Sequence, residues 1–448
     1  MKKIHKYNPT FFLGPLDLIG YYSSLARGLR EIGCKAHILH TGNDSVGRWN
    51  TDSDALPIRW YVKSKHHFDA TRSLSRLDIG RYFPTIQVLF SQLILVMWVA
   101  LTCDVIVMKS GESITHSRAD LKLFKLLGKK IVITYHGSDS RPPYMSGASK
   151  PEDMRQVAAR TVLLRERVLQ ASGLADVIFE SPLSAQFQVR RCCLVQALGP
   201  IIDETRMQPG LEVLSQKPAP SPSVPIRILH APSNPLLKGS DIIANCVEKL
   251  RSEGFNIDYV TVKNRPNSDV IKEIALCDFV IDELYSDAHG AYFSIEALAF
   301  GRPVVVCGYG KEELSRFIPD ELVVPTEYTH PKHLEESVRH LITDLSYRQK
   351  RGEEGILFTQ RQTNAVAAAK NLLTVIFGQA PSSWFFDPQD LRYVHGAAAS
   401  DTAMQKSIAD YIKVNGEGSL FLDDKPELKK AVIQFATGNA TPTSDAQN

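Results

Sequence analysis

The strongest fold signal in the sequence lies at residues 290–305, which read GAYFSIEALAFGRPVV. Gly290 opens a loop, apolar residues then recur with helical spacing, and Gly301 stands where a helix would end. The β-branched run after Pro303 is typical of a buried strand in a parallel sheet. A helix that leads directly into such a strand is half of a βαβ unit, so the stretch predicts an α/β fold.

The same alternation of strand and helix continues on both sides. Short apolar runs that end in turn-forming residues predict strands, and stretches with 3.6-residue periodicity predict helices. In the second half, we expect strands at 226–230, 257–262, 278–281, 303–307 and 321–324 and helices at 240–252, 268–276, 293–300, 331–344 and 363–377. In the first half, we expect strands at 36–39, 104–108, 130–134 and 176–180 and helices at 23–31, 118–127 and 154–170. Two Rossmann-like, doubly wound domains follow from this pattern.

A proline-rich segment separates the two series. Residues 208–225 contain five prolines and little apolar periodicity, which predicts an extended linker. We therefore expect an N-terminal domain over residues 1–207 and a C-terminal domain over residues 226–378. A less regular extension over residues 379–448 completes the chain, and its small, polar last residues predict a disordered end.

Length and composition agree with a two-domain protein. A chain of 448 residues is too long for one ordinary core. With 44% hydrophobic and 23% charged residues, it is neither disordered throughout nor embedded in a membrane. The 52 Lys and Arg against 49 Asp and Glu give a net charge of +3, which argues against nucleic acid as the partner.

Several features predict a cytoplasmic location. The seven cysteines are scattered without metal-ligand or disulfide spacing, which fits a reducing compartment. The first residues show no secretory signal. The long apolar stretch at residues 86–108 contains Gln, Ser, Thr and Asp, so we expect a buried helix and a strand there rather than a membrane span.

The stretch at residues 290–305 resembles the glycine-containing loop, Glu-Ala-Met/Leu-Ala helix and Gly-x-Pro-Val-Val strand of the retaining family 4 glycosyltransferases, the glycosyl transferase group 1 type. The resemblance covers most of residues 1–377. It implies the GT-B fold, in which two Rossmann-like domains face a cleft and the C-terminal domain holds a nucleotide-sugar donor. No metal ion or other cofactor is implied.

Two segments of the sequence carry the donor chemistry in this resemblance. The loop and helix start at Gly290, Ala291 and Tyr292 offer backbone N–H groups to a diphosphate, and Glu296 matches the residue that accepts hydrogen bonds from ribose hydroxyls. Lys238, in HAPSNPLLKGS at residues 230–240, supplies a positive charge for the pyrophosphate and for the leaving diphosphate. The alternatives are a solvated or salt-bridged helix residue for Glu296 and an exposed Lys-Gly pair for Lys238.

The N-terminal half contributes weaker candidates on the acceptor side. The segment KKIVITYHGSD at residues 129–139 ends a strand with His136, which could bind a sugar hydroxyl, and Asp139, which could fix its tautomer or cap the next segment. A histidine with a structural role at a sheet edge is the alternative. Gly14 and Gly20 stand where the family has its glycine-rich loop, although glycines also mark ordinary turns.

The sequence departs from the family pattern at two places. The first of the family's two paired acidic residues is replaced by Ala288, which leaves Asp287 as the neighbouring carboxylate at the donor site. The arginine that precedes the family's lysine is absent, and Arg265 is a candidate to replace it from another loop. Because of these departures, a catalytically silent member of the family is an alternative.

Other kinds of site lack their motifs. No Walker motif and no Gly-x-Ser-x-Gly elbow occur, and the pair at His66 and His67 has no third ligand at a suitable spacing. Phosphate-loop, hydrolase and metal-site functions are therefore not predicted.

The sequence thus predicts a glycosyltransferase that moves a sugar from a nucleoside-diphosphate donor to a glycan or glycolipid acceptor in bacterial surface glycan or glycolipid synthesis. The alternatives are a silent GT-B-like scaffold that binds nucleotide sugars and a sugar-nucleotide epimerase. Weak docking at the inner face of the membrane is a further expectation, from Lys2, Lys3, Lys6 and the basic, aromatic segment at residues 59–67. The alternative for that segment is an ordinary strand edge with solvated lysines.

Overall fold

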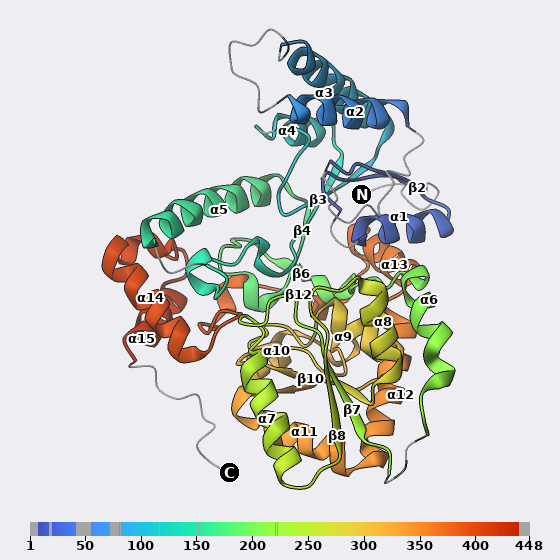
Figure 1. Cartoon of the computed structure of the whole chain (residues 1–448). Helices are drawn as coiled ribbons and strands as arrows, with labels where there is room; N and C mark the ends of the chain where they lie inside the picture. Colours follow the sequence, from blue (N-terminus) through green and yellow to red (C-terminus); the bar gives the residue numbers. More distant parts are fainter. Residues whose placement is uncertain are drawn as a thin grey trace. The chain divides into compact units, whose positions relative to one another are not determined.

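The computed structural model describes residues 8–17, 20–41, 55–71, 80, 82–115, 117–149, 153–219, 221 and 223–438. Its contacts divide the chain into two compact units, and each contains a sheet of parallel strands with helices beside it (Figure 1). Unit 1 comprises Met1–His136, Arg167–Glu180 and Ala365–Pro381, and unit 2 comprises Gly137–Glu166, Ser181–Asn364 and Ser382–Asn448. The predicted α/β fold with two parallel sheets is confirmed, while the domain boundaries at 208–225 and 379 stay predictions.

The described part of unit 1 has parallel strands in the spatial order β5-β4-β3-β1-β2. Most residues of these strands are buried, as expected for parallel strands. The strands are β1 (Thr10–Gly14), β2 (Lys35–Ile38), β3 (Val105–Lys109), β4 (Lys130–Thr134) and β5 (Val177–Glu180). The helices are α1 (Tyr21–Glu31), α2 (Leu56–Ala70), α3 (Tyr82–Thr102), α4 (Ala119–Leu126) and α13 (Ala365–Ile376). The first residues of α5 (Met154–Leu174) belong to unit 2 and its last residues to unit 1.

Unit 2 repeats this topology, with the order β11-β10-β9-β7-β8. The chain order reverses between β7 and β9, which are neighbours in the sheet, and ligands of doubly wound sheets bind at such a switch point. The strands are β7 (Ile226–His230), β8 (Ile257–Thr261), β9 (Phe279–Ile281), β10 (Val304–Cys307) and β11 (Glu327–Thr329). One face of the sheet packs on α7 (Ser240–Ser252) and α11 (Leu334–Thr343) through a buried apolar core that includes Ile228, Val247, Phe279, Val305 and Leu341.

Unit 2 also contains elements outside this core. An antiparallel pair joins β6 (Cys192–Leu194) to β12 (Phe385–Phe386). The remaining α-helices of the described part are α6 (Glu204–Val213), α8 (Asn267–Leu276), α9 (Tyr292–Ala299), α10 (Lys311–Phe317), α12 (Leu345–Gln362), α14 (Asp401–Asn415) and α15 (Pro426–Ala436).

The start of the predicted linker is helical, so the extended conformation expected at residues 208–213 is wrong. Asp203 caps α6 by accepting a hydrogen bond from the Thr205 N–H at 3.1 Å, and Pro209 lies inside the helix. Gly210 is buried so closely that a Cβ there would lie 2.4 Å from the Phe300 ring. Packing of α6 within unit 2 therefore overrides the low helix propensity of proline.

Other sequence-based expectations also need correction. The strand expected at residues 321–324 is wrong, because Asp320–Leu322 form a 3-10 turn and the edge strand is β11. In the C-terminal extension, α14 and α15 replace the irregular structure expected there, while residues 439–448, whose disorder was predicted, lie outside the described residues. Tyr411 of α14 stacks on Tyr144 with ring centroids 4.8 Å apart, so this extension packs within unit 2.

A helix and a strand do occupy the apolar stretch at residues 86–108, but the helix is not buried as expected. Only 33% of its most apolar 18-residue window is buried, although α3 is long and apolar enough to cross a membrane. The basic segment at residues 59–67 lies in α2 and is not a strand edge. The lysines at positions 2, 3 and 6 lie outside the described residues.

Helix α1 contacts α13 through a glycine, and this contact predicts a stability effect. A Cβ at Gly28 would lie 1.9 Å from the Ala365 carbonyl oxygen. We expect Gly28→Ala to lower the free energy of unfolding by about 1–3 kcal/mol, because overpacking outweighs the gain in helix propensity of about 1 kcal/mol.

Urea denaturation of Gly28→Ala beside Gly173→Ala checks this expectation. Gly173 lies in α5 with open space around its Cα, so alanine there should be neutral or stabilising. Equal stability of both variants would contradict the close α1–α13 contact.

Candidate functional site

The candidate site of unit 2 lies where β7 and β9 end. After His230, the chain forms a loop to Gly239, whose left-handed backbone (φ 69°) precedes α7. After Ile281, it forms a second loop that leads to α9. The switch point of the sheet therefore brings the two motifs found in the sequence, at residues 230–240 and 290–305, to one edge.

Lys238 pairs with two carboxylates at this edge. Its Nζ contacts Asp282 Oδ1 and lies 3.3 Å from Glu283 Oε2. The Lys238 side chain is only 16% exposed and that of Asp282 is fully buried. Burial lowers the pKa of Lys238, but the two carboxylates raise it by more, so its pKa lies above the usual value. Lys238 is thus a charged group inside an ion cluster rather than the exposed lysine of the alternative reading.

Asp282 connects Lys238 to helix α9. Its Oδ2 accepts a hydrogen bond from Ser294 Oγ at 2.5 Å, and Ser294 lies in the first turn of α9. A Cβ at Gly290 would lie 2.9 Å from Ser294 Cβ, so the loop passes close to the same turn. Ala291 is the N-cap and Tyr292 the first residue of α9, so the donor-loop residues named from the sequence all lie beside this helix start.

Glu296 is buried and paired. Its Oε1 lies 3.1 Å from Arg206 Nη2 of α6, and its side chain is 7% exposed. Burial raises the pKa of Glu296, while Arg206 and a hydrogen bond from Asn267 lower it. The geometry agrees with the salt-bridged alternative, and the role of Glu296 toward ribose stays a prediction.

Two side chains hold the loop between β9 and α9. Tyr328 Oη donates to the Ser286 carbonyl at 2.8 Å, and Thr326 Oγ1 donates to the His289 carbonyl. His289 is 9% exposed, and burial lowers its pKa to about 4. Its ring meets that of Tyr328 edge to face at 5.2 Å. These contacts fix the backbone that precedes α9.

Asp287, the carboxylate next to Ala288, forms an ion pair with Arg141. The side chains are 14% and 5% exposed, respectively. Asp287 therefore already has a cationic partner, and its contact with a donor sugar stays a prediction. Arg265, proposed to replace the missing arginine, is 68% exposed and lies 3.9 Å from Asp269.

His230 has a structural role. Its Nδ1 lies 2.8 Å from the Ile281 carbonyl oxygen, which can only accept, so Nδ1 carries the proton. Its Nε2 lies 2.8 Å from Ser240 Oγ and can accept a hydrogen bond from that hydroxyl. Burial lowers the pKa of His230. The neutral imidazole joins the ends of β7 and β9 to α7.

The acceptor-side candidates belong to unit 1, apart from Asp139. His136 follows β4, and its ring lies 4.6 Å from that of Tyr21 at the start of α1. Gly14 ends β1, and Gly20 precedes α1 with a left-handed φ of 77°. Asp139 belongs to unit 2, in a 3-10 turn over Gly137–Asp139. The roles of these four residues toward an acceptor stay predictions.

Unit 1 also has a buried carboxylate that the sequence did not reveal. Asp17 accepts hydrogen bonds from the Tyr22 and Ser23 N–H groups at 2.8 and 3.0 Å, which caps α1. Burial raises the pKa of Asp17, although these hydrogen bonds oppose the shift. The glycine-rich loop position is therefore organised by a side chain as well as by Gly20.

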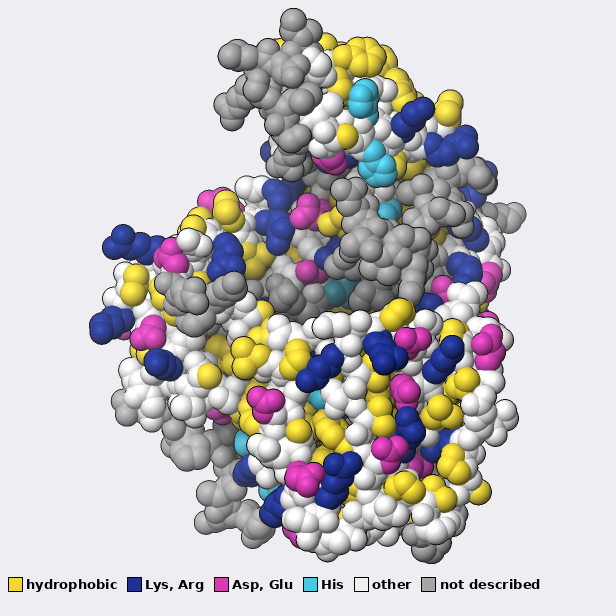
Figure 2. Space-filling model, viewed as in Figure 1, with side chains coloured by type: hydrophobic (Ala, Val, Ile, Leu, Met, Phe, Trp, Pro, Cys, Tyr) yellow, Lys and Arg dark blue, Asp and Glu magenta, His cyan; other side chains and the backbone are white. Residues whose placement is uncertain are grey.

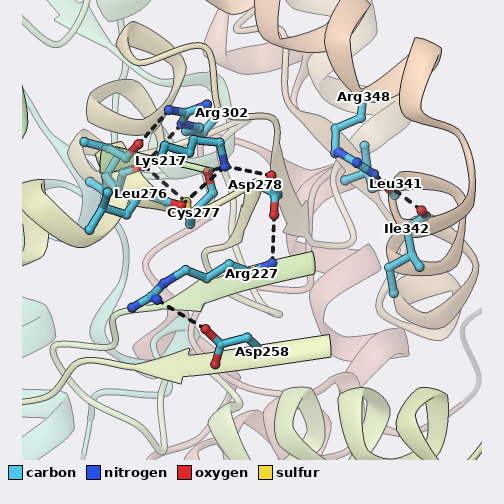
Figure 3. A network of polar contacts seen from close by, with 12 residues as sticks. Lys217, Arg227, Asp258, Leu276, Cys277, Asp278, Arg302, Leu341, Ile342 and Arg348 are labelled. Carbon is cyan, nitrogen blue, oxygen red and sulfur yellow. Dashed lines mark hydrogen bonds and ion pairs between the residues drawn. The ribbon is translucent and has the colours of Figure 1, made fainter. Parts of the chain in front are cut away.

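A cavity of about 630 Å³ lies at the opposite edge of the unit 2 sheet, near the starts of β7, β8 and β9. Figure 3 shows polar contacts among residues that line it. Lys217 donates to the Cys277 carbonyl and to Asp278 Oδ1, both at 2.7 Å, and burial lowers its pKa. Arg227 lies 3.2 Å from Asp258, and Arg348 donates to backbone carbonyls of α11. The cavity lies where these strands start, whereas doubly wound sheets bind their ligands at the carboxyl ends of the strands.

Sequence reasoning missed the residues that organise the site. The predicted residues or their neighbours contact four side chains that the sequence analysis did not name as functional: Asp282, Ser294, Arg206 and Arg141. One signal was available for Asp282, since it directly follows a buried strand. Within the described residues, no three His, Cys, Asp or Glu side chains are grouped as metal ligands would be.

No known protein family matches the chain, and no curated protein is significantly similar in sequence. Solved structures are similar at 10–15% identity. Sucrose-phosphate synthase from Thermosynechococcus elongatus is 14% identical over 84% of this chain and all of its own, with a TM-score of 0.46. The catalytic domain of starch synthase IV from Arabidopsis thaliana, bound to ADP and acarbose, is 10% identical over 83% of this chain and 98% of its own, with a TM-score of 0.49. Anabaena HepE, in complex with UDP and glucose, is 11% identical over 83% of this chain and all of its own, with a TM-score of 0.44. Similarity this low assigns no function to the chain.

Proposed function

We propose that this protein is a GT-B glycosyltransferase of the retaining family 4 type, which transfers a sugar from a nucleoside-diphosphate donor to a hydroxyl acceptor. The observation that carries the proposal is the connection from Lys238 through Asp282 to Ser294 at the start of α9. It unites a cation and a helix N-terminus at the switch point of a parallel sheet, which is where doubly wound folds bind nucleotides.

The donor diphosphate would occupy this edge by exchanging partners with the ion cluster. Lys238 is held by two carboxylates, so a bound phosphate would share its ammonium with Asp282 or replace Glu283. Burial and the neighbouring Asp282 both raise the pKa of Glu283, which favours protonation of this residue when an anion arrives. No metal ion is needed in this scheme, because Lys238 and the helix dipole offset the phosphate charge.

In the transfer itself, the bond from the sugar anomeric carbon to the diphosphate oxygen breaks, and a bond from that carbon to the acceptor oxygen forms on the same face. The acceptor proton passes to the departing phosphate oxygen, and the configuration is retained. Lys238 stabilises the charge that develops on the leaving group, and positioning of the two substrates supplies the rest of the catalysis.

The acceptor is proposed to be a glycan or glycolipid in bacterial surface glycan synthesis, at the cytoplasmic side of the membrane. A silent scaffold remains the second candidate, because Ala288 and Asp287, paired with Arg141, leave the donor sugar without a free carboxylate in that loop. Incubation with nucleotide sugars separates the candidates: a transferred or hydrolysed sugar supports the transferase, binding without turnover supports the scaffold, and an isomerised donor supports an epimerase.

Glu296→Gln tests the ribose contact. If the carboxylate accepts ribose hydroxyls, the variant should bind the matching nucleoside diphosphate about fivefold more weakly, equal to about 1 kcal/mol, and pyrophosphate with unchanged affinity. Titration calorimetry with both ligands measures the two affinities. Glu336→Gln, at a side chain that is 79% exposed, is the matched control. Equal losses for both ligands would leave Glu296 with only its structural pairing to Arg206.

A further inference from the structure

An apolar stripe runs along the exposed side of α3 in unit 1. Nine large side chains, each 36–77% exposed, share this side, and we call them the α3 stripe: Tyr82, Phe83, Ile86, Leu89, Phe90, Leu93, Ile94, Met97 and Leu101. At roughly 200 Å² of surface per side chain, they expose on the order of 1,000 Å². Monomeric soluble proteins rarely expose apolar patches above about 600 Å². We therefore expect an apolar partner to cover the α3 stripe.

The polar side chains of α3 turn away from the stripe to partners in unit 1. Gln92 donates to the Ile114 carbonyl, and Gln87 Oε1 lies 3.3 Å from His67 Nδ1. Ser91 Oγ donates to the Val88 carbonyl at 3.0 Å. The stripe therefore contains no charged side chain and only one with a polar atom near its end, the hydroxyl of Tyr82.

The neighbouring helix α2 gives the stripe a cationic border. Trp60 of α2 meets Phe90 of the stripe edge to face at 5.8 Å, so the two helices lie side by side there. Arg59 and Lys63 are exposed on α2, and no described residue forms an ion pair with either. Figure 2 shows hydrophobic side chains gathered over the region of α2 and α3, with Lys, Arg and His side chains beside them.

The opposite side of α3 belongs to the protein core. Leu95 and Val99 are fully buried and Val88 is 9% exposed, so the helix has one stripe inside unit 1 and one outside. A membrane span would have to remove these residues from the core, although 21 residues would reach about 30 Å. A helix that stays on the protein can instead lie in the membrane surface with its outer side in the lipid.

We infer that the α3 stripe inserts into the headgroup and acyl boundary of an anionic lipid membrane, with Arg59 and Lys63 at the phosphates and Trp60 at the interface. The inference extends the proposed transferase by placing unit 1 on a lipid surface. The sequence predicted weak docking by charge alone. The α3 stripe adds an apolar anchor, and membrane binding through such an anchor depends little on the salt concentration.

Vesicle flotation of the purified full-length chain tests this inference. We expect the wild type to float with vesicles of phosphatidylglycerol and phosphatidylcholine and to keep most of its binding in 0.5 M salt. Leu89→Glu/Leu93→Glu should bind at least tenfold more weakly, whereas Arg59→Gln/Lys63→Gln should lose only the salt-sensitive part. The matched control is Leu357→Glu, at a similarly exposed leucine (66%, compared with 59% for Leu89 and 57% for Leu93) of α12 in unit 2, which should bind as the wild type does.

Circular dichroism of each variant shows whether it is folded, and nucleoside-diphosphate titration shows whether unit 2, which the stripe substitutions leave unchanged, keeps its site. Absence of vesicle binding by the wild type, or equal binding by the stripe variant, would overturn the inference. So would a wild-type dimer that the stripe variant converts to a monomer without any vesicle binding, because a second copy would then cover the stripe. Flotation without nucleoside-diphosphate binding would refute the proposed function and leave the membrane surface supported.

Discussion

Lys238→Met should weaken nucleoside-diphosphate binding about 10- to 150-fold, because a charge-assisted contact to a phosphate is worth about 1.5–3 kcal/mol. The same substitution should lower the free energy of unfolding by about 3–5 kcal/mol, since it leaves the Asp282 carboxylate charged and fully buried without its cation. Calorimetric titration and urea denaturation measure the two losses.

A double variant separates these two effects. In Lys238→Met/Asp282→Asn, the buried charge is gone and the amide oxygen can still accept the hydrogen bond from Ser294. We expect most of the stability to return while binding remains weak. Lys249→Met, which breaks the exposed pair with Glu335 at 2.6 Å, is the control and should leave the stability close to that of the wild type. A double variant that binds as the wild type does would show that Lys238 contributes only to stability.

His289 should make the stability of the protein fall in mild acid. Burial lowers its pKa in the folded chain to about 4, compared with 6.5 for an exposed histidine. As the pH falls below 6.5, the unfolded chain binds a proton that the folded chain refuses until about pH 4. Stability due to this residue is therefore complete above pH 6.5 and decreases by about 1.4 kcal/mol per pH unit, to a total loss of about 3 kcal/mol near pH 4.

His289→Phe isolates this contribution, because phenylalanine keeps the edge-to-face contact with Tyr328 and cannot titrate. The difference in unfolding free energy between the wild type and the variant should change with pH between 6.5 and 4 and stay constant above 7. His230, whose pKa is also lowered, is present in both proteins and cancels from the difference. Parallel stability curves at all pH values would contradict the burial of a neutral His289.

The periodicity of the sequence predicted most of the parallel strands, because short runs of β-branched apolar residues are typical of strands that are buried on both faces. It failed where packing decided the structure. In α6, packing against the rest of unit 2 holds a helix despite Pro209, and β11 has the sequence Glu-Tyr-Thr, which contains no β-branched apolar run. Helix α12 was missed because its mixed, polar sequence shows no clear apolar stripe.

The site was predicted in part, since the loops at Lys238 and Gly290 do meet at one edge of the sheet. The ion pairs were not predictable, because they join residues far apart in the chain: Arg206 to Glu296, and Arg141 to Asp287. A periodic pattern gives the side of a helix that is buried, but it does not say which charged side chain will meet it there. The sequence also did not predict that one apolar side of α3 is exposed. A helix that is apolar all round has no polar side in its sequence to mark the exposed surface.

Calorimetric titration of the wild type and of Lys238→Met/Asp282→Asn with ADP, GDP and UDP tests the donor site most directly. We predict that at least one of these nucleoside diphosphates binds the wild type with a dissociation constant of about 1 mM or below, and that the folded double variant binds it at least tenfold more weakly. Absence of binding by the wild type, or equal affinity for both proteins, would contradict the assignment of the edge between β7 and β9 as the nucleotide-sugar site.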